Sequence, residues 1–462
     1  MNESLCPSVG YIPFAPHQPA AEAQWLEKYL HCQVRCLEAT EHFNLSRNLG
    51  FPSLPELQSA VQPLIREPWI VLEGTGAFLW AAILRLSGFG GGLAILPYLN
   101  PTCLHDILCT ALYRRVHKPI DKVFLGSRQS ARLYHALGIP AQVGEPYGID
   151  SATFQIRHGT SADLAALGIP SRRMLLYTGR VEPDKGVHHL LRVGLKARLL
   201  FPDLILVIAS HRIDPHYGSL LSDLLNEEHG TYLLQDPTTE QLVTLYNHAT
   251  LFVTAATSYY ETFGRAPLEA LACGALAIGP RYDGFCDTLA GPGGILVDLS
   301  ITNDSVSVDE DALLRAVYDV LSRPPSLSRS EISAAAHAAF SRSLAIRLLD
   351  FTLKPAPPCS PQALGWTPDC LPLPCRWRAV IAYIGSAPLD VAVAACLRSE
   401  GHADLAKHDD GFQLAVRQFL ASPAVCKTAK QHRARRQPDG ARAPATSLST
   451  HQGPQPWTAS SP

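Results

Sequence analysis

The amino-acid sequence predicts an α/β protein that contains two doubly wound parallel-sheet domains. Short apolar runs alternate with helical patterns through the first three quarters of the chain, and most runs are apolar at every position. Strands of this kind are buried on both faces, as in a parallel sheet that is covered by helices. The runs are too many for one doubly wound domain, and 462 residues exceed the size of one ordinary core.

The first strand–helix–strand unit is predicted at residues 69–99. WIVLEG (69–74) is typical of a strand, GAFLWAAILRLSG (76–88) of a helix, and LAILPYL (93–99) of the next strand. Charged residues and glycines interrupt this apolar stretch, so it is not expected to cross a membrane. The later apolar runs predict strands at 122–127, 174–180, 203–210 and 250–257, and a helix is predicted at 128–138.

An irregular segment (145–173) is expected to contain the seam between the domains, which are predicted at 1–165 and 166–328. A long helical pattern follows at 329–354. A change of composition then indicates a Pro-rich linker, a small and mainly helical module whose role the sequence does not indicate, and a disordered tail, at 355–376, 377–427 and 428–462.

Charge and cysteine content exclude several classes of protein. The chain has 39 basic and 41 acidic residues, so we expect no nucleic-acid binding and at most peripheral membrane contact. The N-terminal segment has no basic region followed by an apolar run, which argues against a signal peptide and favours a cytoplasmic location. The 12 cysteines include no CxxC pair, and the spacing of Cys359, Cys370 and Cys375 does not fit a metal site. No metal site is predicted.

Two cations follow a predicted strand in LLYTGRVEPDKGVHHLLRV (175–193). Arg180 leaves the carboxyl end of the strand, where ligands bind in open parallel sheets, and Lys185 precedes the next helix. Two cations beside a helix N-terminus can hold a diphosphate. A surface loop with two solvated cations would show the same pattern.

Two glutamates lie in TAATSYYETFGRAPLEALACGA (254–275), a stretch that is otherwise poor in charge. Glu261 is expected on the loop after a strand, and Gly264 would let backbone amides approach an anion. Pro267 suits the first turn of a helix, and Glu269 is expected about two turns into that helix on the side that faces the cleft. Both carboxylates could accept hydrogen bonds from ligand hydroxyls, with the helix N-terminus between them binding phosphate.

The order and spacing of GRVEPDKG, LVTLYNHATLFVTAAT, ETFGRAPLE and GPRYDGFCDTL resemble the retaining, nucleotide-sugar-dependent glycosyltransferases of family 4, in group 1. The resemblance covers about residues 122–354 and includes YGIDSATF (147–154). It implies a GT-B fold, in which two Rossmann-like domains face a cleft. The first domain would take the acceptor and the second the nucleotide sugar, and the helical pattern at 330–353 would lead back to the first domain.

The resemblance also implies roles for individual residues. Arg180 and Lys185 would neutralise the departing diphosphate, and Glu261 would hold hydroxyls of the donor sugar as a catalytic residue. Glu269 would bind the ribose of the nucleotide. Backbone groups would make the further contacts with the donor, at Phe263, Gly264, Arg265 and Gly179. The departing phosphate would itself take the acceptor proton, and neither a cofactor nor a metal is expected to be required.

The predicted first domain departs from the family pattern. It lacks the usual double-glycine loop after its first strand, and it lacks a histidine at LPYLNPT (96–102). Asn100, Tyr98 or His105 could replace that histidine on the acceptor side, although each could equally be a packing or capping residue.

Three functions therefore remain open. The first is a hexosyltransferase of glycan or glycoconjugate biosynthesis, which transfers a sugar to an acceptor hydroxyl with retention of configuration. The second is a non-catalytic module that binds a nucleotide sugar or a partner, and the third is a sugar-nucleotide epimerase or hydrolase. The sequence does not identify the base, the sugar or the acceptor, which could be a glycan, a lipid-linked sugar or a small molecule.

Overall fold

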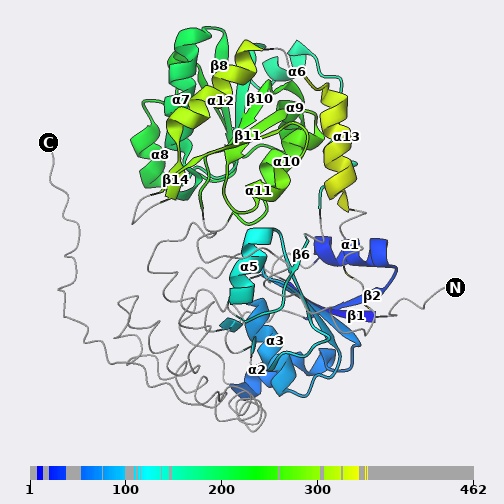
Figure 1. The fold of residues 1–462 in the computed structure, drawn as a ribbon. Helices are drawn as coiled ribbons and strands as arrows, with labels where there is room; N and C mark the ends of the chain where they lie inside the picture. Colours follow the sequence, from blue (N-terminus) through cyan, green and yellow to red (C-terminus); the bar gives the residue numbers. More distant parts are fainter. Residues whose placement is uncertain are drawn as a thin grey trace, which may run out of the picture.

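Two parallel sheets form the described part of the protein. The computed structural model describes residues 8–13, 20–37, 54–74, 76–98, 109–110, 113–114, 116–136, 138–144, 148–258, 261–301, 306–323, 326–342, 349 and 351. Figure 1 shows the two sheets one above the other, with the N-terminal sheet below and the later elements above. This arrangement confirms the predicted α/β fold class.

The first sheet has the strand order β2-β1-β3-β4-β5-β6, and every pairing is parallel. Its strands are β1 (Ser8–Ile12), β2 (Gln33–Cys36), β3 (Trp69–Glu73), β4 (Gly92–Leu96), β5 (Lys122–Leu125) and β6 (Gln142–Val143). Its helical elements are α1 (Ala20–Leu30), α2 (Leu54–Val61), η2 (Gln62–Leu64), α3 (Ala77–Leu86) and α5 (Arg128–Ala136). The predicted strands at 69–74, 93–99 and 122–127 are confirmed, whereas β1 and β2 were not predicted.

The second sheet has the order β12-β11-β10-β7-β8-β9, again with parallel pairings throughout. Its strands are β7 (Arg173–Thr178), β8 (Leu204–Ser210), β9 (Thr231–Gln235), β10 (Leu251–Val253), β11 (Leu276–Pro280) and β12 (Gly294–Val297). A small antiparallel pair, β13 (Leu299–Ile301) and β14 (Val306–Val308), lies beside it.

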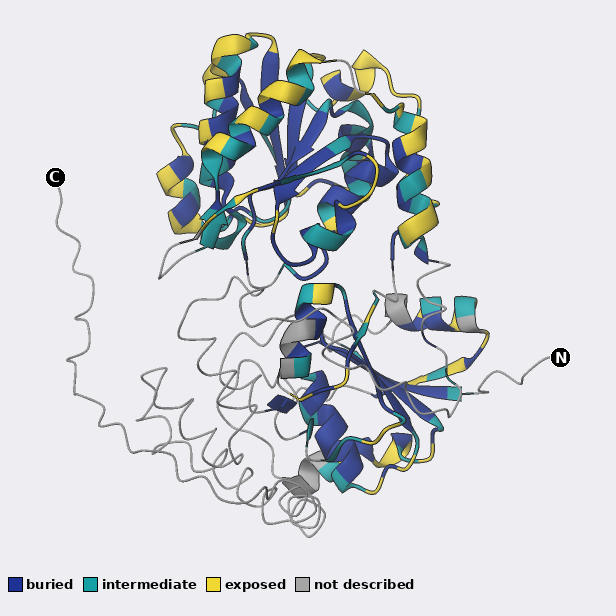
Figure 2. Cartoon of the chain, viewed as in Figure 1, coloured by how far each residue is buried: buried dark blue, intermediate teal, exposed yellow. Residues whose placement is uncertain are grey.

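Helices cover both faces of the second sheet. Their bounds are α6 (Ser161–Ala165), η3 (Pro183–Lys185), α7 (Val187–Leu200), α8 (Pro215–Leu221), η4 (Glu227–His229), α9 (Thr239–His248), α10 (Arg265–Ala272), α11 (Phe285–Thr288), α12 (Glu310–Ser322) and α13 (Arg329–Phe340). Successive residues of β7 point to opposite faces of the sheet. Leu175 packs in the hydrophobic core with α7 and α12, and Leu176 packs in the core on the other face with α9, α10 and α13. Figure 2 shows the strands buried and the outer helix surfaces exposed.

The chain returns to the first sheet after α13. Ser341 has an extended backbone, so α13 ends well before Leu353, the predicted end of the helical pattern. Next to it, the Arg342 guanidinium lies 3.6 Å from the Trp25 ring centroid, above α1. Further on, Leu349 is buried in a hydrophobic core of the first sheet, and the Phe351 ring centroid lies 5.7 Å from that of Trp69.

The predicted linker, small module and tail lie outside the described residues. The domain boundaries at 165 and 328, and the cytoplasmic location, stay predictions. Among the described helices, none combines the length and the apolar character needed to cross a membrane.

Candidate active site at the carboxyl edge of the second sheet

A tight turn follows β7, and we call residues 178–186 the β7 turn. Gly179 has φ 148°, and a Cβ atom there would lie 2.8 Å from the Tyr177 hydroxyl, so the position favours glycine. The Tyr177 hydroxyl donates to the Arg180 carbonyl oxygen at 2.7 Å, which holds the turn against the end of β7. The Arg180 side chain is 40% exposed, and its guanidinium pairs with Glu182 and, at 3.8 Å, with Asp184.

Lys185 ends the short helix η3 and points at Glu261. Its Nζ lies 2.6 Å from Glu261 Oε2, and the two side chains are only 12% and 20% exposed. Gly186 follows with φ 63°, and a Cβ atom there would lie 2.7 Å from the Ala255 carbonyl oxygen. The β7 turn and the segment after β10 therefore pack closely, as the parallel pairing of β7 with β10 requires. Two of the predicted catalytic residues are thus in contact.

Residues 261–264, which we call the Glu261 loop, lie between two glycines that are far apart in the sequence. A Cβ atom at Gly126, just after β5 of the first sheet, would lie 2.9 Å from the Thr262 carbonyl oxygen. A Cβ atom at Gly284 would lie 2.4 Å from the Phe263 backbone nitrogen. The loop is therefore held between the first sheet and the segment that follows β11. Gly264, with φ 80°, then caps α10.

Glu269 is the fifth residue of α10, one helical turn from its start rather than the two turns predicted. Its Oε2 accepts a hydrogen bond of 2.9 Å from the Tyr246 hydroxyl of α9. Burial raises the pKa of the Glu269 carboxyl above its usual value, while the Tyr246 hydrogen bond and the charge of Arg265 act in the opposite direction. Arg265 itself is exposed at the first position of the helix.

The acceptor-side candidates are only partly described. Tyr98, with φ 60°, presents its carbonyl oxygen to the Thr262 hydroxyl, so the backbone after β4 contacts the Glu261 loop. Asn100 and His105 lie outside the described residues. The prediction that one of these three residues serves an acceptor is left as a prediction.

Contacts between the two sheets gather at the N-terminus of α5, and sequence reasoning did not identify them. Asp283 is buried and accepts hydrogen bonds from the Ser127 and Ser130 hydroxyls, the latter at 3.1 Å. One turn on, Asp287 accepts from the Arg128 backbone amide at 2.8 Å and pairs with its guanidinium. Both aspartates lie in GPRYDGFCDTL (279–289), and two carboxylates at a helix N-terminus are favourably placed. No local pattern indicated their partners.

A histidine pair follows the β7 turn at the start of α7. The His188 and His189 ring centroids are 3.9 Å apart, and His188 Nδ1 lies 2.6 Å from the Tyr217 hydroxyl oxygen. Burial, followed by the charges of His189 and Arg192, lowers the pKa of His188 to about 4. Burial raises the pKa of the Glu310 carboxyl, but hydrogen bonds from Arg192 and His189 outweigh burial and lower this pKa to about 2.

Because of His188, stability is expected to fall as the pH drops from 6.5 toward 4. The unfolded chain takes up the imidazole proton near the ordinary pKa of 6.5, whereas the folded protein takes it up only near 4. The stabilisation that comes from the neutral His188 ring is therefore fully present above pH 6.5 and is lost as the pH falls toward 4. Because the ring is only half-buried and solvent screens its charge, this stabilisation amounts to about 1 kcal/mol. Urea unfolding of wild type and His188→Gln at pH 7 and pH 5 measures it. Equal losses in both proteins would contradict the assignment.

The described residues hold no group of three or more His, Cys, Asp or Glu side chains that could bind a metal ion. Positive charge at the site comes from Arg180, from Lys185 and from the N-terminus of α10. The arrangement can accept a ligand that carries both phosphate and hydroxyl groups.

Comparisons with known proteins show a family match over the second sheet and its helices. Residues 162–325 match the family model of the glycosyl transferases group 1. Alpha-maltose-1-phosphate synthase of Mycobacterium tuberculosis is 30% identical over 178 residues, which are 37% of this chain and 44% of that protein. D-inositol 3-phosphate glycosyltransferase of Mycolicibacterium gilvum is 32% identical over 165 residues, 34% of this chain and 36% of that protein. The chain spans less than half the length of these curated relatives.

Solved structures share the fold over most of the described chain. Anabaena Alr3699/HepE, in complex with UDP and glucose, superimposes with a TM-score of 0.57 at 15% identity, over 74% of this chain and 98% of that one. Sucrose-phosphate synthase of Thermosynechococcus elongatus gives a TM-score of 0.56 at 16% identity, with the same two coverages. The fold is therefore GT-B, and residues 162–325 match the family model of the glycosyl transferases group 1.

Proposed function

We propose that this protein transfers a glycosyl group from a nucleoside diphosphate sugar to an acceptor hydroxyl, with retention of configuration. The observation that carries the proposal is the contact between Lys185 and Glu261 at the N-terminus of α10, beside Arg180. It combines cations for a diphosphate with a carboxylate for sugar hydroxyls in one small volume. The HepE structures with UDP, glucose and UDP-glucose support a nucleotide-sugar donor.

The residues would act at successive points along the donor. Glu269 would accept a hydrogen bond from a ribose hydroxyl. Arg180 and Lys185 would stabilise the negative charge that grows on the diphosphate as the glycosidic bond breaks, together with the backbone amides of the Glu261 loop and Arg265. This charge compensation needs no metal ion in our proposal.

Glu261 would hold hydroxyls of the transferred sugar on the side opposite the ribose. Glu261 Oε2 pairs with Lys185 Nζ at 2.6 Å, so a donor phosphate that binds Lys185 would exchange one partner of the lysine for another. The departing phosphate oxygen would take the proton of the acceptor hydroxyl, which would attack from the same face of the sugar and so retain the configuration. The acceptor would enter beside the backbone of Tyr98, where the first sheet contacts the loop.

A donor screen tests the reaction and separates the alternatives. UDP, GDP, ADP and TDP sugars are incubated with the protein, with and without a pool of glycans, lipid-linked sugars and small polyols. We expect nucleoside diphosphate release that depends on the acceptor, and an NMR spectrum of the product with the donor's anomeric configuration. Release without acceptor, or an epimerised donor, would replace the proposal with a hydrolase or epimerase, and binding without turnover would replace it with a binding module.

Lys185→Ala and Arg180→Ala are each expected to weaken nucleoside diphosphate binding by about 1.5–3 kcal/mol, because each removes a charge-assisted contact. Lys185→Ala should have the larger effect, since it also leaves Glu261 without its cation in a largely buried site. Arg180 is more exposed and its loss should lie at the lower end. Isothermal titration with the free diphosphate measures both.

Arg173→Ala provides the matched control, because Arg173 stands at the opposite end of β7 and pairs with Asp203. This variant should bind the diphosphate as wild type does. If Lys185→Ala and Arg180→Ala also keep wild-type affinity, the diphosphate site is elsewhere.

A further inference from the structure

We propose that Tyr246 and Thr178 form a buried hydrogen-bond chain that positions the Glu269 carboxylate for the nucleotide ribose and couples it to the β7 turn. This inference rests on the proposed function, since it concerns how the same donor site is organised. Neither residue is assigned a contact with the donor. Both act through Glu269, and they are therefore positioning residues.

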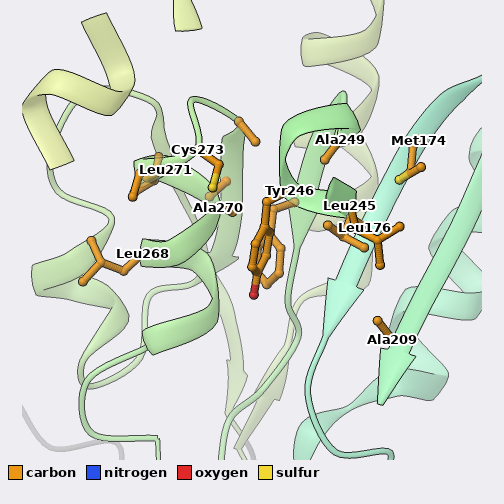
Figure 3. Close-up of a cluster of buried hydrophobic side chains, with 14 of the residues drawn as sticks. Met174, Leu176, Ala209, Leu245, Tyr246, Ala249, Leu268, Ala270, Leu271 and Cys273 are labelled. Atoms are coloured by element: carbon orange, nitrogen blue, oxygen red, sulfur yellow. The ribbon is translucent and has the colours of Figure 1, made fainter. Parts of the chain in front are cut away.

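The distances define a continuous chain from β7 to α10. The Thr178 hydroxyl oxygen lies 2.6 Å from the Tyr246 hydroxyl oxygen, which in turn lies 2.9 Å from Glu269 Oε2. Tyr246 is completely buried and Thr178 is 6% exposed, so water does not compete for the bond between these two hydroxyls, and the bond to Glu269 is partly buried. Figure 3 shows the Tyr246 ring between Ala270 of α10 and Leu176 of β7.

Proton counting gives the chain a direction. A tyrosine hydroxyl carries one proton, and an ionised carboxylate can only accept. Tyr246 must therefore donate to Glu269, and Thr178 must donate to Tyr246. Burial keeps the pKa of the Tyr246 hydroxyl well above its usual value, so this donor stays protonated.

The chain leaves one carboxylate oxygen of Glu269 for a ligand. Oε2 is taken by Tyr246, and Oε1 accepts no hydrogen bond from any residue that the structure describes. A half-buried carboxylate with one satisfied oxygen can bind a further donor on its other oxygen. A ribose hydroxyl supplies such a donor, and the fixed position of Oε2 determines where Oε1 points.

The same chain reaches the other half of the donor site. Thr178 is the last residue of β7, directly before Gly179 and Arg180 of the β7 turn. The Phe154 ring packs against Tyr246 edge to face at 6.1 Å and limits its rotation. Movement of the β7 turn therefore changes the hydrogen bond that orients Glu269, although the two segments are far apart in the sequence.

Three ionisable groups face Glu269 from the elements around it: Tyr246 of α9, Arg265 of α10, and Cys273, which follows α10. Burial raises the pKa of the Glu269 carboxyl, and the Tyr246 hydrogen bond opposes this. Removal of the hydroxyl should move this pKa further upward. Because the protonated acid is a poorer acceptor, ligand affinity should then start to fall at a higher pH.

The experiment compares Tyr246→Phe and Thr178→Val with wild type in the full-length protein. We expect Tyr246→Phe to bind UDP roughly tenfold more weakly and Thr178→Val roughly threefold more weakly. Binding of inorganic pyrophosphate, which has no ribose, should not change. The acidic limb of UDP affinity should shift to higher pH in Tyr246→Phe. If nucleoside diphosphates other than UDP bind wild type better, the best of them serves as the probe.

Tyr113→Phe is the matched control. The Tyr113 hydroxyl also donates to a buried carboxylate, at 2.8 Å to Asp121, but it does so in the hydrophobic core that packs on the first sheet. A general cost of losing a tyrosine–carboxylate bond would appear in both variants as a lower melting temperature. Only Tyr246→Phe should change ribose-dependent affinity.

Carbon-13 NMR of labelled glutamate carboxyls, assigned with Glu269→Gln, supplies a readout without ligand. The pKa of Glu269 should rise in Tyr246→Phe and stay at its wild-type value in Tyr113→Phe. An unchanged pKa together with wild-type UDP affinity would overturn the inference. If wild type binds no nucleoside diphosphate at all, the proposed function fails, and with it the ribose role of Glu269, whatever the pKa result. Should Tyr246→Phe not fold, Thr178→Val decides by the same two measurements.

Discussion

Glu261→Gln is expected to slow sugar transfer by roughly 100-fold or more, while free nucleoside diphosphate binds as well as to wild type or slightly better. The substitution keeps the size of the side chain and one acceptor oxygen but removes the charge. A contact to the sugar that strengthens as positive charge develops on it acts on the rate, whereas the bare diphosphate has no sugar to lose.

The contact with Lys185 explains why affinity should not fall. In wild type the lysine is paired with Glu261 at 2.6 Å, and an entering diphosphate competes with that carboxylate. In Glu261→Gln the full lysine charge is available to the phosphate. Glu269→Gln should behave differently and weaken both donor and diphosphate, since both contain the ribose.

Single-turnover transfer and titration with the diphosphate, performed on each variant, test this prediction. Glu240→Gln is the control, because Glu240 is an exposed glutamate of α9 that pairs with Arg157. It should leave both quantities unchanged. Transfer at the wild-type rate in Glu261→Gln would show that the catalytic site has been misplaced.

Asp121→Ala is expected to lower the free energy of unfolding by about 3–5 kcal/mol, the largest effect on stability that we predict. Asp121 and Arg85 form an ion pair whose side chains are each only 2% exposed. The carboxylate also accepts from the Tyr113 hydroxyl at 2.8 Å and from the Lys118 amide at 2.9 Å. Its removal leaves a buried guanidinium without its counter-charge.

Asp203→Ala is the matched control for this experiment. Asp203 pairs with Arg173, but the two side chains are 53% and 35% exposed, so the loss should be much smaller than in Asp121→Ala. Urea unfolding followed by circular dichroism measures both variants, and hydrogen exchange of the β3 and β4 amides locates the change in the first sheet. A loss below 1 kcal/mol in Asp121→Ala would contradict the buried-pair interpretation.

The sequence predicts the strands whose burial is uniform. β3, β8 and β10 are apolar at nearly every position, and a run of that kind has few other stable environments. β1 (SVGYI) was missed because it is short and contains a serine and a glycine. Only its neighbours in the sheet, β2 and β3, make it a strand.

For the candidate site, the positions of residues along the chain could be predicted, but their contacts with one another could not. Lys185 and Glu261 could be placed at the ends of two strands, but their contact depends on β7 and β10 being neighbours, and strand order is not written in local patterns. The partners of Asp283 and Asp287 depend on how two separate sheets dock. Tyr246 lies in a stretch that helped to indicate the family, yet its hydroxyl contact with Glu269 arises only when α9 and α10 pack side by side.

The position of the Glu261 loop has a consequence for how this protein could be divided. The loop packs on one side against Gly126, which follows β5 of the first sheet, and on the other side against Gly284, which follows β11 of the second sheet. An excised fragment of residues 148–342, which keeps α13 with the core that it packs against, would retain Arg180, Lys185 and Glu269, the residues that we propose bind the nucleotide. It would lose the surface that fixes the backbone beside the sugar. If the proposed function holds, one half alone would recognise the nucleotide, whereas transfer of the sugar would require both halves and would be lost if one half were exchanged for an unrelated one.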